Sequence, residues 1–234
     1  MQHSNTLDGR ILYEDNHLII VNKRASEIVQ GDKTGDIPLS DIVKDYIKIQ
    51  YNKPGNAFLG VVHRIDRPVS GAVIFARTSK ALTRLNNMLR EGSIKKKYLA
   101  VVQDLPPLPE GKLIHHLKKN EKQNKSYVSQ KDTKGAKQAE LNYKLLADSK
   151  NYYLLEVELL TGRHHQIRAQ LSAAGCPIKG DLKYGFSRSN KDGSIHLHAW
   201  LLDFIHPVSG NQIPVKAPVP EHDPVWCAFQ ENSI

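Results

Sequence analysis

Residues 63–71 of the chain read HRIDRPVSG, and in this segment a single acidic residue, Asp66, lies among arginine and histidine side chains. Positive charge nearby favours the ionised form of a carboxylate, so we expect Asp66 to act as a nucleophile or as a base. The same arginines would offer positive charge to a substrate that carries phosphate. The structural alternative is an acid that caps a turn and pairs with a neighbouring arginine.

Three further segments follow in order along the chain and extend this pattern. Residues 95–100 read KKKYLA, residues 161–168 read TGRHHQIR, and residues 175–185 read GCPIKGDLKYG. Together with residues 63–71, they resemble the sequence boxes of the RluA-type RNA pseudouridine synthases. The resemblance runs from about residue 11 to residue 220, and several linked boxes in one order are far more specific than any single box.

Some positions depart from the pattern of that family. Pro68 and Val69 stand where relatives more often have x-Thr, and residues 23–26 read KRAS where relatives show Lys-Pro-x-Gly. The second change removes a rigid turn and puts the conformation of that loop in doubt. Neither change removes Asp66, so the chemistry that the resemblance implies is unaffected.

The chain of 234 residues carries 33 lysine and arginine residues against 24 acidic ones, a formal net charge of +9. Such an excess of positive charge is typical of proteins that bind a polyanion, and with the family resemblance it predicts RNA, ribosomal or transfer, as the partner. Cys176 and Cys227 form no C-x-x-C pair, so neither a zinc finger nor a disulfide scaffold is expected.

The first residues lack the apolar core of a signal peptide, and no apolar stretch is long enough to span a bilayer. We therefore expect a cytoplasmic protein with no membrane partner. Many relatives carry a small RNA-binding module ahead of the catalytic domain, but the first strand-like run here begins near residue 10. The expectation is a single catalytic domain over residues 1–234, without an N-terminal RNA-binding module, acting as a monomer.

Hydrophobic periodicity predicts a mixture of helices and strands. Helices are expected over residues 38–50 and 166–174. A further helix is expected to begin with Ser79 as its cap and to end at Gly92. Strands are expected over residues 10–13, 17–22, 72–76, 98–102, 153–160, 197–205 and 212–216. The first two and the last two of these are each expected to form a hairpin. Strands joined by turns predict an α+β fold with a mixed, largely antiparallel sheet. The resemblance adds that this central sheet is bent, flanked by helices and crossed by a central cleft.

The resemblance implies a reaction that breaks the bond between C1′ and N1 of a uridine, turns the uracil and joins C1′ to C5. No atom is gained or lost, so neither a metal nor any other cofactor is expected. Asp66 would serve this reaction in one of two ways. Its carboxylate attacks C1′ and holds the sugar covalently, or it removes a proton from C2′ to give a glycal-like intermediate. The sequence leaves both routes open.

Two further residues match catalytic positions of the family. Tyr98 matches the tyrosine whose ring lies against the target base and whose hydroxyl is a candidate acceptor of the proton from C5; a tyrosine buried in the core is the alternative. Arg168 matches the arginine expected to pair with the catalytic carboxylate, since a guanidinium fork suits a carboxylate. Arg163, five residues earlier, competes for that role.

Other basic residues are expected to bind RNA. Arg64 and Arg67 would contact phosphates around the target nucleotide or brace the loop. Arg163 and His164 would lie at the start of a helix, where backbone N–H groups favour an anion. The lysine-rich residues 112–137 are a candidate RNA-facing arm, with a solvated basic loop as the alternative. Its proposed contacts are Lys118, Lys119 and Lys122. A uridine within a helix must leave its stack, so base flipping is also expected.

Two other classes of protein remain as alternatives. A non-catalytic RNA-binding or ribosome-assembly protein could use the same fold, but it would have no need for Asp66, Tyr98 and Arg168 together. A metal-dependent hydrolase could draw ligands from the 11 histidines, yet none of them occurs in a frame such as H-E-x-x-H. We therefore expect an RNA-uridine isomerase with Asp66 as its essential residue.

Overall fold

The computed structural model describes residues 7–233 of the chain, with side chains described up to residue 229. The chain divides into two compact units. Unit 1 consists of Met1–Ile94 and Ala199–Pro218, and unit 2 of Lys95–His198 and Val219–Ile234. Both units combine helices with antiparallel strand pairs, so the expected α+β class is confirmed. No helix in the described part of the chain is long and apolar enough to cross a membrane.

Unit 1 contains a sheet with the strand order β1-β2-β4-β10, to which β3 and β11 add through β4 and β10. Two hairpins predicted from sequence, β1 with β2 and β10 with β11, are confirmed. The strands are β1 (Ile11–Glu14), β2 (Leu18–Lys23), β3 (Gly60–Val61), β4 (Ser70–Ala76), β10 (Leu197–Ile205, in this unit from Ala199) and β11 (Gln212–Lys216).

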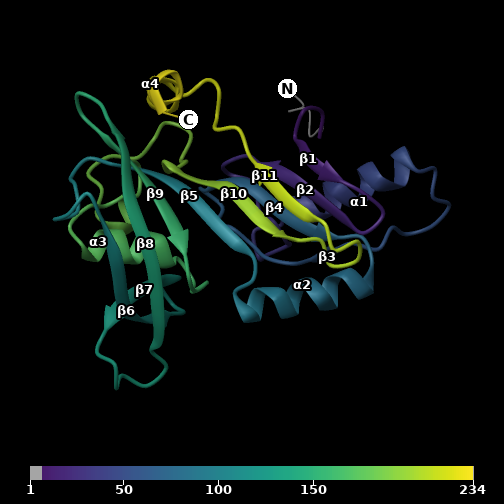
Figure 1. The fold of residues 1–234 in the computed structure, drawn as a ribbon, viewed down its shortest axis with the longest axis horizontal. Coiled ribbons are helices and arrows are strands. Elements are labelled where there is room, and N and C mark those ends of the chain that lie inside the picture. Colours follow the sequence, from purple (N-terminus) through teal and green to yellow (C-terminus); the bar gives the residue numbers. More distant parts are fainter. Residues whose placement is uncertain (1–6, 234) are drawn as a thin grey trace. The chain divides into compact units, whose positions relative to one another are not determined.

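The predicted helices of unit 1 are α1 (Leu39–Gln50) and α2 (Ser79–Glu91), and α2 packs against β4 (Figure 1). The cap of α2 is Thr78, whose hydroxyl accepts the backbone N–H of Ala81, so the expectation that Ser79 caps this helix is wrong. A capping residue typically has an extended backbone, and Thr78 has one, with φ −138° and ψ 151°, whereas Ser79 is already the first residue of the helix. Gly92 ends the helix as predicted, in the left-handed conformation.

One core cluster of unit 1 lies between α2 and the sheet. Strand β4 is buried along its whole length, which explains why it reads as a continuous apolar run rather than an alternating one. The core cluster contains Leu18, Ile20, Ile74, Leu85, Phe204 and Val215 among others. The loop that carries Asp66 leads directly into β4, so a fully buried strand of the unit anchors that loop.

Unit 2 contains an antiparallel sheet with the strand order β5-β9-β8-β6-β7. Its strands are β5 (Lys95–Val102), β6 (Glu110–Asn120), β7 (Lys125–Ser129), β8 (Lys137–Asp148) and β9 (Tyr153–Leu159). The predicted helix becomes α3 (Gln166–Ala173), which packs on β6 and β7 (Figure 1). A 3₁₀ turn, η1 (Leu182–Tyr184), and a C-terminal helix, α4 (Pro224–Ser233), complete the unit.

The lysine-rich residues 112–137 form strands that sequence periodicity did not predict. They contain most of β6, the β6–β7 hairpin and the first residue of β8. The side chain of Leu117 packs against α3, whereas Lys112, Lys118 and Lys119 are exposed. In β6 the apolar Leu113 and Ile114 are adjacent and two histidines follow, so the alternation typical of a half-buried strand is weak in the sequence. The segment is therefore a hairpin and not a loop, and its role as an RNA-facing arm stays a prediction.

Candidate active site

Asp66 lies in unit 1 on the loop between β3 and β4, and its side chain is half-buried. Its carbonyl oxygen accepts the backbone N–H of Val69 at 3.0 Å, which closes a turn through Arg67 and Pro68. Val69 and Ser70, which follow the turn, are buried. The turn therefore begins at the acid and ends in the core, and this fixes the backbone from which the carboxylate projects.

Gly71, which lies at the start of β4 just after the turn, allows this strand to approach β10 very closely. Its φ of +117° lies in a region that side-chain-bearing residues rarely adopt, and a Cβ atom added there would lie 2.3 Å from the carbonyl oxygen of Ala199. Strand β10 therefore packs directly against the backbone of Gly71. This close approach explains the glycine at the end of the segment HRIDRPVSG, because no larger residue permits it.

Lys23 also holds this turn, and its side chain is completely buried. Its ammonium group donates hydrogen bonds to the carbonyl oxygens of Arg24 at 2.8 Å, Glu27 at 2.8 Å and Arg67 at 3.1 Å. Burial lowers the pKa of Lys23 to about 7, although the nearby carboxylates of Glu27 and Asp66 act in the opposite direction. Sequence reasoning missed this residue, for which the only signal was the family pattern Lys-Pro-x-Gly.

Ser26 occupies the glycine position of that pattern and resolves the doubt about the loop. Its φ is +72°, a conformation in which glycine is normally found, and its backbone N–H donates to the carbonyl oxygen of Arg67 at 2.9 Å. The loop thus keeps the turn although it has neither the proline nor the glycine of the family. Two groups on this loop and strand, from Lys23 and Ser26, therefore bind the residue that follows Asp66.

The arginines on either side of Asp66 differ in their surroundings. Arg67 is exposed and binds the carboxylate of Asp36 and, at 2.9 Å, the hydroxyl of Thr34, so it braces the loop. Arg64 is exposed as well. The imidazole Nε2 of His63 accepts the backbone N–H of Ile74 at 3.1 Å, which ties the start of the segment to β4.

Tyr98 and Arg168 both belong to unit 2. Tyr98 lies in β5 with 8% of its surface exposed, and the residues that follow it in the strand are fully buried. Arg168 lies in α3 with 5% exposed, and its Nε and Nη2 donate to the Oδ2 and Oδ1 atoms of Asp181 at 2.7 and 2.9 Å. This contact uses two of the five N–H donors of a guanidinium, so three can serve other partners.

Asp181 is the carboxylate partner that sequence reasoning missed. It lies 13 residues beyond Arg168 and was visible only as part of the box GCPIKGDLKYG. Its side chain is 1% exposed, and a buried carboxylate needs such a cation because an unpaired charge is costly away from water. Asp181 thereby orients the guanidinium of Arg168. The expected pairing of Arg168 with Asp66 stays a prediction.

Residues 163–165 connect α3 with strands β7 and β8 rather than only opening the helix. Arg163 is exposed and donates from Nε to the carbonyl oxygen of Gln138 at 2.8 Å. The rings of His164 and His165 stack with centroids 3.8 Å apart, and His164 lies 2.9 Å from the hydroxyl of Ser126 through Nδ1. His165 is the residue before α3 and adopts a left-handed conformation, with φ 52°. Backbone of this kind in a non-glycine residue is strained and is held in place by its contacts.

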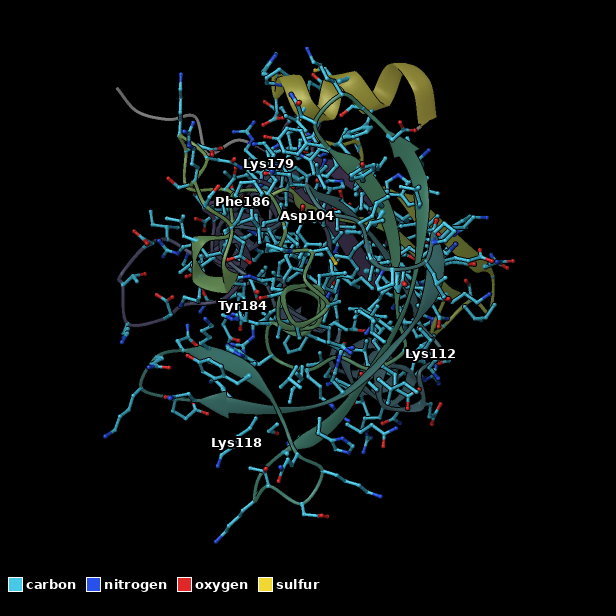
Figure 2. The ribbon with its side chains drawn as sticks, turned by 90° about the vertical axis from the view of Figure 1, so that its left-hand side faces the viewer. Asp104, Lys112, Lys118, Lys179, Tyr184 and Phe186 are labelled. Atoms are coloured by element: carbon cyan, nitrogen blue, oxygen red, sulfur yellow. The ribbon has the colours of Figure 1, made fainter. Side chains whose placement is uncertain are left out.

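The three lysines proposed to bind RNA lie on the β6–β7 hairpin, and all are exposed. Lys118 faces Tyr127 across the strand pair, Lys119 forms an ion pair with Glu121 at 2.6 Å, and Lys122 lies in the connecting turn. Figure 2 shows Lys118 on this hairpin and Tyr184 close to it. In the described part of the chain, no three histidine, cysteine or acidic side chains are grouped as metal ligands.

Comparison with known proteins identifies the class of enzyme. The family model described as RNA pseudouridylate synthase matches residues 17–173. The chain therefore belongs to this family and is an isomerase of that class.

Relatives and solved structures agree with the assignment. The chain is 37% identical to the ribosomal large subunit pseudouridine synthase C of Buchnera aphidicola, over 94% of this chain and 70% of that one. It is 32% identical to the ribosomal large subunit pseudouridine synthase D of Zymomonas mobilis, over 90% and 69% of the two chains. The fold matches human RNA pseudouridylate synthase domain containing 4 with a TM-score of 0.77 at 22% identity, over 92% and 90% of the chains.

Proposed function

We propose that the protein converts specific uridines of ribosomal or transfer RNA to pseudouridine, with Asp66 as the catalytic carboxylate. The observation that carries the proposal is the turn after Asp66, where the carbonyl oxygen of Arg67 binds both Lys23 and Ser26 and where Gly71 packs against Ala199. A nucleophile or base accelerates a reaction most when its backbone is already fixed in position before the substrate binds. The names of the relatives favour ribosomal RNA as the substrate.

The proposed chemistry begins at the sugar of the target uridine. In the covalent route, an oxygen of Asp66 bonds to C1′ while the C1′–N1 bond breaks, and the released uracil later displaces the carboxylate through C5. In the glycal route, Asp66 takes a proton from C2′ as the base leaves and returns it when the C1′–C5 bond forms. In both routes the proton on C5 is lost and N1 gains one, so the atoms of the RNA balance without a cofactor.

Tyr98 and Arg168 complete the proposed catalytic group. The ring of Tyr98 would stack on the displaced uracil, and its hydroxyl would accept the proton from C5. Arg168, already oriented by Asp181, would use further N–H donors to hold the carboxylate of Asp66. Support for this grouping comes from the order of the boxes in the sequence and from membership of the family.

The proposed RNA contacts come from basic residues of both units. These are Arg64, Arg67, Arg163, His164, Lys118, Lys119 and Lys122, of which all except His164 are exposed. Phosphate contacts of this kind position an RNA without reading its sequence. They would offset the cost of flipping the uridine out of its stack, on the order of a few kcal/mol. The proposal further describes a monomeric, cytoplasmic enzyme in which both units form one catalytic domain, without metal or membrane partner.

The experiment that tests this function maps pseudouridine in total RNA from cells that lack the gene. Wild-type protein, Asp66→Asn and Asp66→Ala are each returned to these cells, with Asp41→Asn as a matched control on the exposed face of α1. We expect a site to disappear and to return with wild type and Asp41→Asn only. Restoration by either Asp66 variant would contradict a catalytic Asp66. If no site is lost, the catalytic function is contradicted and a non-catalytic RNA-binding role replaces it.

A further inference from the structure

Tyr184 in η1 connects three parts of unit 2 through its hydroxyl group. The residue is 3% exposed. Its oxygen accepts the backbone N–H of Ser126, in β7, at 2.8 Å and lies 3.0 Å from Nδ1 of His165. A hydroxyl group has one donor and two acceptor sites, so it can bind both partners at once. The hydroxyl therefore joins the RNA-facing hairpin to the residue that precedes α3.

The ring of Tyr184 contacts the guanidinium that we assign to the active site. The guanidinium carbon of Arg168 lies 5.0 Å from the centre of the ring, a distance at which a cation is attracted to the π system. The backbone of Tyr184 is also tied to the ion-pair partner of Arg168, since its N–H donates to the carbonyl oxygen of Asp181 at 3.0 Å. Ring and carboxylate together restrict Arg168 from two directions.

The same ring contacts a lysine of the hairpin. The ammonium group of Lys125 lies 5.0 Å from the ring centre of Tyr184 and 5.1 Å from that of the exposed Tyr127. Two cations, Lys125 and Arg168, thus share one buried ring, and like charges repel each other more strongly where water is scarce. A phosphate bound at Lys125 would reduce this repulsion and favour the arrangement seen around Arg168.

Further contacts reinforce the link between the hairpin and α3. The hydroxyl of Ser126 donates to the carbonyl oxygen of His164 at 2.7 Å, and Nε2 of His164 lies 3.1 Å from the side-chain oxygen of Asn124. Lys183, beside Tyr184, donates to the carbonyl oxygen of Asn124 at 3.2 Å. Among the described residues, the local core cluster is small and consists of Leu117, Ala139, Ala169 and Tyr184. Polar contacts therefore contribute much of what holds this region together.

We propose that Tyr184 is a positioning residue that couples RNA bound on the β6–β7 hairpin to the guanidinium of Arg168. Its hydroxyl keeps the hairpin against α3, and its ring keeps Arg168 aligned on Asp181. Coupling between two sites is reciprocal, so RNA on the hairpin stabilises the position of Arg168, and an aligned Arg168 favours RNA binding. This inference rests on the proposed function, because it assigns an RNA contact to the hairpin and a catalytic partner to Arg168.

The test separates the two roles with two substitutions of one residue. Tyr184→Phe keeps the ring and removes the hydroxyl, whereas Tyr184→Met removes both. Tyr143→Phe is the matched control, a buried tyrosine of the same unit whose hydroxyl lies beside Gly111 in β6. Single-turnover assays on RNA carrying the mapped uridine measure the Kd and the rate constant of isomerisation separately.

We expect Tyr184→Phe to raise the Kd for RNA about tenfold and to leave the isomerisation rate constant within about twofold of wild type. Tyr184→Met should in addition lower that rate constant about a hundredfold, because Arg168 loses the ring that restrains it. Tyr143→Phe should change neither. The proposal is overturned if both Tyr184 variants lower the melting temperature while leaving Kd and rate constant unchanged. It fails equally if Tyr184→Phe reproduces the full effect of Tyr184→Met.

A second readout needs no catalysis. The ¹⁵N signal of the Arg168 Nε–H group is followed while a short uridine-containing stem–loop RNA is added. We expect the signal to shift in the wild type and to stay in place in Tyr184→Phe at equal RNA occupancy. An unchanged wild-type signal, or the same shift in the variant, would overturn the coupling. If the wild type isomerises no uridine, the proposed function fails, whereas this signal still decides whether the hairpin and Arg168 are coupled.

Discussion

Arg168 binds Asp181 through both carboxylate oxygens, at 2.7 and 2.9 Å, and the two side chains are 5% and 1% exposed. The pair explains how a guanidinium can be almost completely buried and still take part in the proposed catalysis. One carboxylate neutralises and orients it through two donors, and the other three donors can serve other partners. The stability of unit 2 and the proposed catalysis therefore depend on the same ion pair.

Asp181→Asn should destabilise the protein by about 3–5 kcal/mol, because it leaves the positive charge of Arg168 buried without its carboxylate partner. Urea denaturation measures the change. Asp41→Asn removes an exposed partner of Lys44 at 3.0 Å and should cost less than about 1 kcal/mol. Equal costs for the two variants would show that burial does not set the strength of the Arg168–Asp181 pair.

Gly71→Ala should cost about 3 kcal/mol or more, since the new Cβ would lie 2.3 Å from the carbonyl oxygen of Ala199 at a φ of +117°. Gly92→Ala is the control that measures the cost of the left-handed backbone conformation alone, without a steric clash. Gly92 has a φ of +72°, and a methyl group added there would meet no atom within 4 Å, so the cost should be about 1 kcal/mol. Thermal unfolding compares them, and similar melting temperatures would contradict the close approach of β10 to β4.

Lys23 should make stability depend on pH in a defined direction. Burial lowers its pKa from 10.5 to about 7 in the folded protein, so between these values the unfolded chain binds more protons than the folded one. The free energy of unfolding of the wild type, relative to that of Lys23→Met, should therefore increase as the pH rises from about 7 to 10.5. Lys44→Met, at an exposed position, should show no such trend. A flat difference between wild type and Lys23→Met would rule out this description.

The three hairpin lysines should contribute to RNA affinity through counterion release. Replacing Lys118, Lys119 and Lys122 together by alanine should reduce the magnitude of the slope of log K against log salt by about 2–3, since each phosphate contact contributes roughly 0.7–0.9. Lys80→Ala removes an exposed lysine from α2 in unit 1 and should leave the slope unchanged. Binding measured over a series of salt concentrations gives both slopes. A triple variant with the wild-type slope would show that RNA does not lie on this hairpin.

Tyr98→Phe should lower the single-turnover rate of isomerisation by about a hundredfold or more, because it removes the proposed acceptor of the C5 proton. Stacking on the base depends on the ring, so the Kd for RNA should change little. Tyr153→Phe, at the start of β9, removes a hydroxyl elsewhere in the same sheet and serves as the control. Wild-type rates in Tyr98→Phe would exclude the hydroxyl from the chemistry.

The local sequence pattern was sufficient to predict the helices and the hairpins of unit 1. Apolar residues at helical spacing predicted α1 and α2, and alternation around polar turns predicted β1 with β2 and β10 with β11. Strand β6 was missed because its sequence, EGKLIHHLKKN, does not alternate regularly between apolar and polar residues. Strand β8 was missed although residues 139–145, AELNYKL, do alternate. The cap of α2 was misplaced by one residue, to Ser79 instead of Thr78, because both side chains carry a suitable hydroxyl.

The linear sequence determined the family and predicted its chemistry with Asp66 as the catalytic residue, because these depend on which residue types occur in a fixed order. Only the tertiary structure decided which contacts hold the predicted site residues in position. The buried ammonium of Lys23, the partner Asp181 and the contacts of Tyr184 join residues that lie far apart along the chain. Burial and hydrogen-bond geometry arise when the backbone brings such residues together, and no local pattern in the sequence encodes them.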